Sequence, residues 1–337
     1  MSLAFTLPRE LEEPVEREAV RLLVASRDGL EHARFHDLPD LLAPGDLLVI
    51  NTSATLPASL PADRPGGERL RLHLSTPLRP GEGSDPLSRP DSRGLTPLWV
   101  AELRDGTARF RGGQAGERLW AVRLGLPEPL LDYLARHGSP IRYGHAAADL
   151  PLADYQTVFA TEPGSAEMPS AARPFTDRLV SRLVARGIAF APITLHTGVS
   201  SLEAGELPYP ERFRVPPATA EAVNAARRVI AVGTTVVRAL ETTARADGTV
   251  EPGRGWTGEV ITPARGVRAV DGLITGWHDP DTSHLELLEA VGGRELIERS
   301  YAAALDQGYR WHEFGDSHLI LPTRRRQERS ASSTSDM

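Results

Sequence analysis

Apolar and polar positions follow different periods in successive parts of this chain. Near the N-terminus, Arg21 to Ala25 and Leu30 to Phe35 are short apolar runs on either side of an Asp-Gly turn, and they predict a β-hairpin. Asp46 to Asn51 is apolar through its middle and ends in a polar residue. This pattern predicts a buried strand whose end reaches a ligand-binding edge of a sheet.

Between about Leu56 and Tyr143 the pattern changes to an alternation of period two. The alternating segments are Arg69 to Leu74, Leu98 to Leu103 and Leu119 to Leu124. Clusters of Gly and Pro separate them, so we expect a small antiparallel sheet or barrel. The stretch from Pro80 to Gly94 is rich in Gly, Pro, Ser and Asp, and we expect it to be a mobile loop of this β module.

Helical and strand patterns return after residue 149. Thr176 is placed to cap an amphipathic helix expected over 177–186, and Ile188 to Leu195 predicts a strand that ends at His196. A later strand is expected to end at His278 in the same way. Further helices are expected over 217–228 and 294–307, and a last strand over 314–321.

The residues around Gly233 carry the clearest local signal. Val229 to Val232 is apolar and largely β-branched, Gly233 permits a tight turn, and Thr234 and Thr235 are N-cap types before an amphipathic segment. This order predicts a strand, a turn and a helix whose first N–H groups and dipole suit an anionic group. It is not a P-loop, because no lysine follows the glycine.

Together these patterns predict an α/β fold in which a discontinuous α/β domain is interrupted by a small antiparallel β-barrel insert. The α/β domain is expected over 1–56 and 149–322, the insert over 57–148, and a disordered tail over 323–337.

The composition of the chain excludes several classes of location and chemistry. The chain has 337 residues, 40% apolar and 25% charged, and no apolar stretch or signal sequence that would direct it to a membrane, so we expect it to be cytoplasmic. We also expect a monomer. The absence of cysteine excludes disulfides and thiolate chemistry, and the absence of lysine excludes a Schiff base. The histidines show no metal-binding spacing, so no metal is expected. The net charge of −7 argues against a general nucleic-acid coat protein.

Several motifs occur in a fixed order along the chain. They are Tyr155 to Ala160, Thr194 to His196 with Gly198, Ala231 to Glu241, Gly255 to Thr257, and Leu273 to Thr275 with His278. In this order the chain resembles the S-adenosylmethionine:tRNA ribosyltransferase-isomerase family of queuosine biosynthesis. The strongest match is A-V-G-T-T-V-V-R-A-L-E, which is similar to that family's A-V-G-T-T-V-x-R-x-L-E.

The resemblance implies an unusual use of S-adenosylmethionine as a substrate. Its ribosyl part moves onto the aminomethyl group of 7-aminomethyl-7-deazaguanine in a tRNA anticodon and is isomerised to give epoxyqueuosine, while adenine and methionine leave. The resemblance also implies no metal and no other cofactor, and an α/β domain interrupted by a small β-barrel.

The same resemblance assigns site residues. Those expected to be catalytic are His196, His278 and Glu211. Those expected to bind substrate are Gly198, Gly233, Thr234, Thr235, Arg238, Glu241, Ser170, Trp256 and Thr275. Arg238 is expected to hold the methionine carboxylate through a bidentate contact. Each of these residues also has a purely structural alternative. The histidines could be hydrogen-bonded to the backbone, Arg238 could form a surface ion pair with Glu241, Glu211 could be an exposed charge on a loop, and Trp256 could pack in the core.

The chain departs from the family pattern in segments that carry polar groups. The family's P-T-A-G-L-H-F stands here as Pro169 to Phe175, with Ala172 in place of Gly and Pro174 in place of His, and its N-D-T-R stands as Asn51 to Ala54. Two alternatives therefore stay open. One is the same donor chemistry on a small-molecule acceptor, and the other is a non-catalytic RNA- or nucleoside-binding relative.

Overall fold

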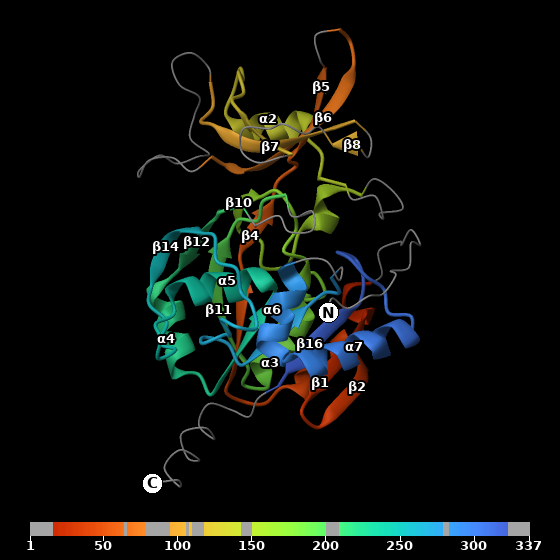
Figure 1. Cartoon of the computed structure of the whole chain (residues 1–337), viewed down its shortest axis with the longest axis vertical. Helices are drawn as coiled ribbons and strands as arrows, with labels where there is room; N and C mark the ends of the chain where they lie inside the picture. The colour runs from red at the N-terminus through yellow and green to blue at the C-terminus, as the bar shows by residue number, and fades with distance from the viewer. Residues whose placement is uncertain are drawn as a thin grey trace.

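The computed structural model describes residues 16–63, 66–78, 95–105, 108–109, 118–142, 150–199, 209–278 and 283–322. Figure 1 shows a larger lower part built around one sheet and a smaller upper part with its own strands. The expected loop from Pro80 to Gly94 and the expected tail over 323–337 lie outside the described residues. No described helix is long and apolar enough to span a membrane.

A mixed sheet of nine described strands organises the larger part (Figure 1). In spatial order the strands are β14 (Gly253–Thr257), β12 (Glu211–Val215), β11 (Ala189–Leu195), β3 (Asp46–Asn51), β13 (Arg228–Val232), β15 (Gly272–Thr275), β16 (Ser317–Leu321), β1 (Arg21–Ser26) and β2 (Gly29–Arg34). β1 and β2 form the predicted hairpin. The strand predicted from Asp46 to Asn51 is also confirmed.

The sheet direction places several strand ends at one edge. β11, β3, β13 and β15 are parallel neighbours, so their carboxyl ends meet there. β12 and β16 run antiparallel to β11 and β15, so their first residues lie at the same edge. Residues far apart in the sequence, such as Asn51, Glu211 and Thr275, are thereby gathered at one boundary of the sheet.

Helices cover both faces of this sheet. Those of the larger part are α1 (Leu38–Leu41), α3 (Asp177–Ala185), α4 (Pro217–Ala225), α5 (Thr234–Thr243), α6 (Ser283–Gly292) and α7 (Arg294–Asp306), with short 3-10 turns at η1 (Arg17–Ala19), η2 (Phe35–Asp37), η3 (Leu152–Tyr155) and η4 (Ser170–Ala172). The predicted cap of α3 is confirmed, since Thr176 Oγ1 accepts a hydrogen bond from Leu179 N at 3.1 Å.

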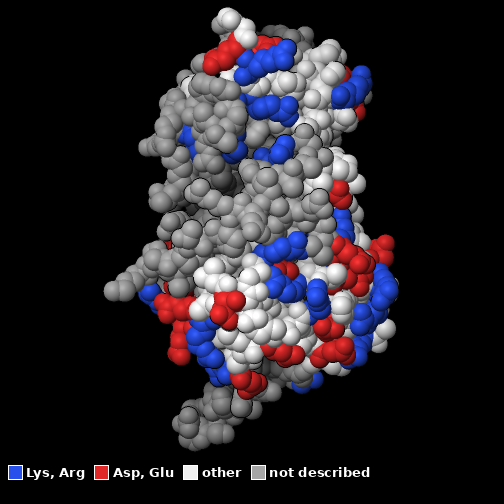
Figure 2. All heavy atoms as spheres, turned by 90° about the vertical axis from the view of Figure 1, so that its right-hand side faces the viewer, with Lys and Arg blue, Asp and Glu red and all other residues white. Residues whose placement is uncertain are grey.

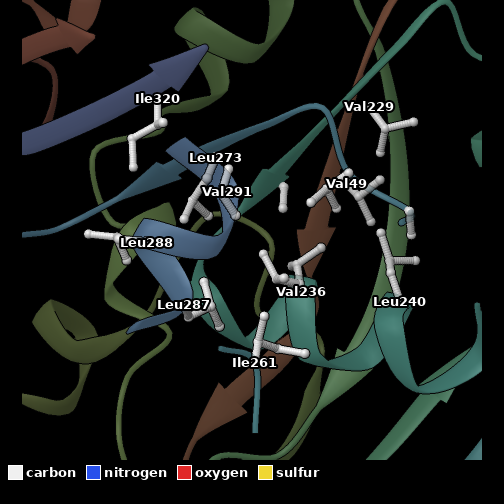
Figure 3. Packing of buried hydrophobic residues seen from close by; sticks show 14 of the residues in the cluster. Val49, Val229, Val236, Leu240, Ile261, Leu273, Leu287, Leu288, Val291 and Ile320 are labelled. Atoms are coloured by element: carbon white, nitrogen blue, oxygen red, sulfur yellow. The ribbon is translucent and has the colours of Figure 1, made fainter. Parts of the chain in front are cut away.

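The apolar residues of the central strands alternate between two cores. Val49 and Ala231 face a core that α5 and α6 cover, and Figure 3 shows Val236, Leu240 and Leu288 packing there. Their chain neighbours on the strands face a second core against α3. Because both faces are covered, the strands are apolar in continuous runs, which is the pattern that the sequence displays.

The smaller part contains a second, antiparallel sheet. Its described strands are β5 (Ser59–Asp63), β6 (Arg69–Pro77), β7 (Trp99–Asp105), β8 (Ala108–Arg109) and β9 (Leu119–Val122), and α2 (Leu130–His137) packs with them. This sheet confirms the predicted antiparallel pairing. Its closure into a barrel, and the boundaries of a separate insert domain, stay predictions.

A short parallel pair joins the two parts. β4 (Ser53–Thr55) pairs with β10 (Glu162–Ser165) where the chain leaves the large sheet and where it returns (Figure 1). Gln156 reinforces this pair, because its side chain bonds both the N–H and the carbonyl of Thr55, at 3.0 and 2.8 Å. The connection is therefore held by hydrogen bonds on both passes of the chain.

Candidate active site

A cavity of about 170 Å³ lies at the carboxyl edge of the large sheet, against the smaller part formed by β5 to β9 and α2, which we call the insert. The expected site residues that line it are Ser170, Gly198, Glu211, Gly233, Thr234, Thr235, Arg238, Thr275 and His278. Sequence reasoning missed other lining residues, among them Ser75, Glu167, Tyr209, Glu259, His284 and Glu313. These come from loops, from the smaller part and, for His284, from the first turn of α6, where no local pattern marks a position as facing a ligand.

The turn at Gly233 forms one wall of the cavity. Gly233 is itself the N-cap of α5, with φ of 99°, and no side chain caps the helix, so the expectation that Thr234 or Thr235 caps it was wrong. A positive φ is accessible to glycine at little cost and lets β13 turn directly into α5. The first N–H groups of a helix have no acceptor within it, so this wall offers donors to an anion.

Glu211 and Arg238 form an ion pair on the opposite side of the turn. Glu211 Oε2 contacts Arg238 Nη1, while Oε1 accepts from the Gly198 N–H at 2.8 Å. Arg238 Nε also donates to the Glu259 carbonyl at 3.1 Å. The alternative of a surface pair between Arg238 and Glu241 is therefore wrong. Arg238 faces the cavity with its guanidinium already tied to the wall.

Glu241 lies away from the cavity. It is 2% exposed, its Oε1 accepts from the N–H groups of Arg268 and Ala269 at 2.7 and 2.8 Å, and its Oε2 pairs with Arg265. These bonds fix the loop before β15. The structure thus gives Glu241 a position that supports this loop and does not bring it to the lining.

Trp256 is also outside the lining. It is half-buried on β14. Its neighbour Thr257 contacts Thr242 of α5 at 2.6 Å, so Trp256 points to the other face of the sheet. Trp256 therefore does not line the cavity, where a purine could stack on it, and it is not fully buried in the core.

His196 lies behind the cavity, in the junction between the two parts. Its Nδ1 is 2.8 Å from Ser53 Oγ, which is 2.6 Å from Ser165 Oγ. A Cβ on Gly164 would fall 2.2 Å from this ring nitrogen, so the ring packs directly on the β10 backbone. Burial, followed by Arg212, lowers the pKa of His196 to about 3. The ring is neutral, packed and outside the lining.

His278 lines the cavity at the end of β15. Its Nε2 is 2.9 Å from Thr275 Oγ1, and its ring stacks on that of His284 with centroids 4.5 Å apart. Burial, followed by the charge of His284, places the pKa of His278 well below its usual value. A neutral imidazole at a cavity wall can accept a proton.

The lining carries more acidic than basic side chains. The acidic residues are Glu167, Glu211, Glu259 and Glu313, and Arg238 is the one arginine among the described lining residues. Arg238 pairs with Glu211, and Arg265, outside the lining, pairs with Glu259 at 3.1 Å. With His278 and His284 neutral, this wall favours a cationic group over an anionic one, apart from the donors at the Gly233 turn. No group of three or more acidic or histidine side chains in the described ranges is arranged to hold a metal ion.

The insert completes the cavity through Ser75 of β6. Its Oγ accepts a hydrogen bond from the Val199 N–H at 2.9 Å. A Cβ on Gly198 would fall 2.7 Å from the same oxygen, so the two parts approach closely at this point. The cavity is therefore built from both parts of the molecule.

A family model described as "Queuosine biosynthesis protein" matches residues 1–320. The chain belongs to this family. Among its relatives, the S-adenosylmethionine:tRNA ribosyltransferase-isomerase of Moorella thermoacetica is 41% identical over 92% of this chain and 95% of its own length. That of Symbiobacterium thermophilum is 39% identical over 94% and 98%. The family resemblance expected from the motifs is confirmed.

A solved member of this family has the same fold. The crystal structure of S-adenosylmethionine tRNA ribosyltransferase from Thermotoga maritima is 28% identical, with a TM-score of 0.53, and the match covers 94% of this chain and 99% of that one. The mixed α/β class is therefore shared along almost the whole chain.

Proposed function

We propose that this chain is an S-adenosylmethionine:tRNA ribosyltransferase-isomerase that forms epoxyqueuosine on tRNA carrying 7-aminomethyl-7-deazaguanine. The observation that carries the proposal is the cavity itself. It combines a helix start with several carboxylates, in a chain that is 36–41% identical to enzymes of that name. S-Adenosylmethionine has matching features, since it carries a carboxylate, an ammonium and a sulfonium.

The donor fits the two walls in one orientation. The N–H groups of Thr234 and Thr235 suit the methionine carboxylate, whereas the Gly233 N–H already donates to the Ile274 carbonyl at 2.8 Å. The acidic side chains of the lining suit the ammonium and the sulfonium. In this arrangement Arg238 contributes mainly by holding Glu211 in place, because its guanidinium is already bonded to the wall. This differs from the bidentate role expected from the sequence.

The reaction requires a base on the acceptor side. The aminomethyl group is an ammonium at neutral pH and loses a proton before its nitrogen forms the new N–C bond. The bonds from the ribosyl part to sulfur and to adenine break while its ring rearranges to an epoxycyclopentanediol. Methionine leaves with the sulfur electron pair, and adenine leaves with its electron pair and takes a proton. The ribosyl part gives up one carbon-bound proton, and the acceptor nitrogen gives up a second proton as it becomes a secondary amine. His278 is the neutral base on the cavity wall that can accept the proton of the acceptor.

A tRNA acceptor also requires cations for its phosphates. The described part of the insert exposes Arg69, Arg71, Arg123 and Arg136. Figure 2 shows basic and acidic side chains interspersed on both parts. We expect the exposed arginines of the insert to contact the tRNA backbone.

The proposal is tested by mixing the protein, S-adenosylmethionine and tRNA carrying the aminomethyl-deazaguanine base. We expect adenine release by chromatography and epoxyqueuosine in the digested tRNA by mass spectrometry. Adenine release only with the free base would indicate a small-molecule acceptor, and donor binding without release would indicate a non-catalytic relative. We also predict that the protein is monomeric and cytoplasmic and needs no metal or added cofactor. Light scattering tests the oligomeric state. The same assay after dialysis against a chelator tests the metal requirement.

A further inference from the structure

The two histidines of the cavity wall stack face to face. The ring centroids of His278 and His284 are 4.5 Å apart, and the ring planes differ by 10°. His278 follows β15, whereas His284 lies in the first turn of α6. The contact therefore joins two elements of the wall, and neither the motifs nor the spacing in the sequence indicates it.

The ring of His278 is held from a second direction. Its Nε2 lies 2.9 Å from Thr275 Oγ1, and its main-chain N lies 3.4 Å from the Tyr301 hydroxyl. The stacked neighbour fixes the plane of the ring, and the Thr275 contact fixes its rotation within that plane. The ring thus has one orientation toward the cavity.

Several charged or titratable groups face this pair. They are Arg238 from α5, Tyr301 from α7, His312 and Glu313 from the loop after α7, and His318 from β16. Burial and then Arg238 lower the pKa of His284 to about 4. Two stacked rings in such a place cannot both carry a proton, so the pair takes up one proton at most.

We propose that His284 is a positioning residue for His278, which fixes the plane of the His278 ring and makes the stacked pair a one-proton acceptor. The inference rests on the proposed function, in which the acceptor ammonium gives its proton to His278. The stacked ring remains flat against His278 before and after this transfer, so the acceptor nitrogen meets a base in a fixed position.

Two variants of His284 separate the effect of its flat ring from the effect of its ring nitrogens. His284→Phe keeps a flat ring, whereas His284→Leu fills the place without one. We expect His284→Leu to lower kcat roughly 10- to 100-fold, the cost of a misplaced catalytic group, with KM for S-adenosylmethionine changed less than about twofold. His284→Phe is expected to retain most of kcat. His36→Leu, on the exposed turn after β2 in the larger part and outside the lining, is the control and should leave both constants unchanged.

The pH profile gives a readout that a merely structural role does not move. Removing His284 removes one cause of the lowered pKa of His278, so this pKa rises in both variants. Since His278 must be neutral to accept a proton, the acid limb of kcat/KM should move to higher pH. An unmoved acid limb, or a kcat of His284→Leu within about twofold of the wild type, overturns the proposal.

NMR titration of the two rings tests the pair independently of turnover. We expect one proton to enter the pair, and only one ring to titrate, down to the pH at which the protein unfolds. Two independent titrations overturn the inference. A wild type that releases no adenine refutes the proposed function, and the titration then decides whether the stacked pair behaves as a single acceptor.

Discussion

At the scale of single residues, the cavity depends on carboxylates whose positions are fixed by partners. Glu211 is held by Arg238 and by the Gly198 N–H, so its charge is paired within the wall. The side chains of Arg238 and Glu211 are only 13% and 12% exposed. A largely buried charge is costly when its partner is removed, which makes this pair a sensitive point of the site.

We expect Glu211→Gln to lower the free energy of unfolding by about 1–3 kcal/mol, because Arg238 loses its counter-charge in a largely dry position. The matched control is Glu162→Gln, since Glu162 pairs with Arg214 at 42% and 51% exposure. An exposed pair of this kind contributes about 0–1 kcal/mol. Urea unfolding measures both variants, and equal costs would contradict the assignment of Glu211 and Arg238 to a buried wall.

Buried histidines predict a loss of stability in acid. The pKa of His196 and of His318 is lowered to about 3, in each case chiefly by burial. The unfolded chain binds a proton at these rings near pH 6.5, whereas the folded protein does not until about pH 3. Stability is therefore complete above pH 6.5 and falls as the pH drops through this window, by roughly 1.4 kcal/mol per pH unit for each ring.

His318→Phe tests this account at one ring. His318 is stacked on Trp277 with planes 8° apart, and among the described residues no hydrogen-bond partner reaches either ring nitrogen. Phenylalanine keeps the stacking and removes the proton site. The slope of the unfolding free energy against pH should therefore decrease by about 1.4 kcal/mol per pH unit between pH 6.5 and 4, which corresponds to one proton. His137→Phe is the surface control, and an unchanged slope in His318→Phe contradicts the prediction.

At the scale of elements, local patterns predicted most helices and strands. The run Val229 to Val232, the turn at Gly233 and the helix after it occur as expected, since β-branched runs, glycine and amphipathic spacing act over a few residues. β11 ends at Leu195, directly before His196 as expected, whereas β15 ends at Thr275, three residues before His278. The sequence could not show that one of these histidines lines the cavity and the other faces the junction, because this depends on which neighbour packs beside each strand end.

The junction between β6 and the end of β11 gives a test at this scale. We expect Gly198→Ala to weaken S-adenosylmethionine binding and to lower the unfolding free energy by about 1–3 kcal/mol, because its Cβ overlaps Ser75 Oγ. Gly258→Ala is the matched control, since its Cβ would meet only Pro210 at 3.8 Å. Calorimetry of the donor and urea unfolding measure both effects.

A second substitution shows whether the overlap is the cause. Combining Gly198→Ala with Ser75→Ala removes the oxygen that the new methyl group meets, so part of the lost affinity should return even though the Val199 N–H loses its acceptor. If the double variant is as weak as the sum of both single variants, the close approach at this junction does not govern the cavity.

At the scale of the whole molecule, the cavity belongs to both parts. Ser75 comes from the insert, Gly198 and Arg238 come from the large sheet and its helix, and the short pair of β4 and β10 connects the parts. A ligand in this cavity should therefore stabilise segments of both.

Hydrogen exchange with and without S-adenosylmethionine measures this effect. We expect slower exchange at the start of α5, around Thr197 to Val199 and at the C-terminal half of β6, with no change in α2, which does not line the cavity. Protection confined to the large sheet would contradict a site completed by the insert. Protection in α2 as well would indicate that the whole insert becomes ordered by the donor.

The sequence by itself determined the family and the strand, turn and helix at Gly233, since these depend on short patterns and on motif order. Its lack of cysteine and lysine also excluded thiolate and Schiff-base chemistry. Only the tertiary structure decided that Arg238 pairs with Glu211 and not with Glu241, and that His284 stacks on His278. Such partners come from different strands and helices. Their contacts are set by sheet order and by helix packing across long separations in the chain, which no local period of apolar residues encodes.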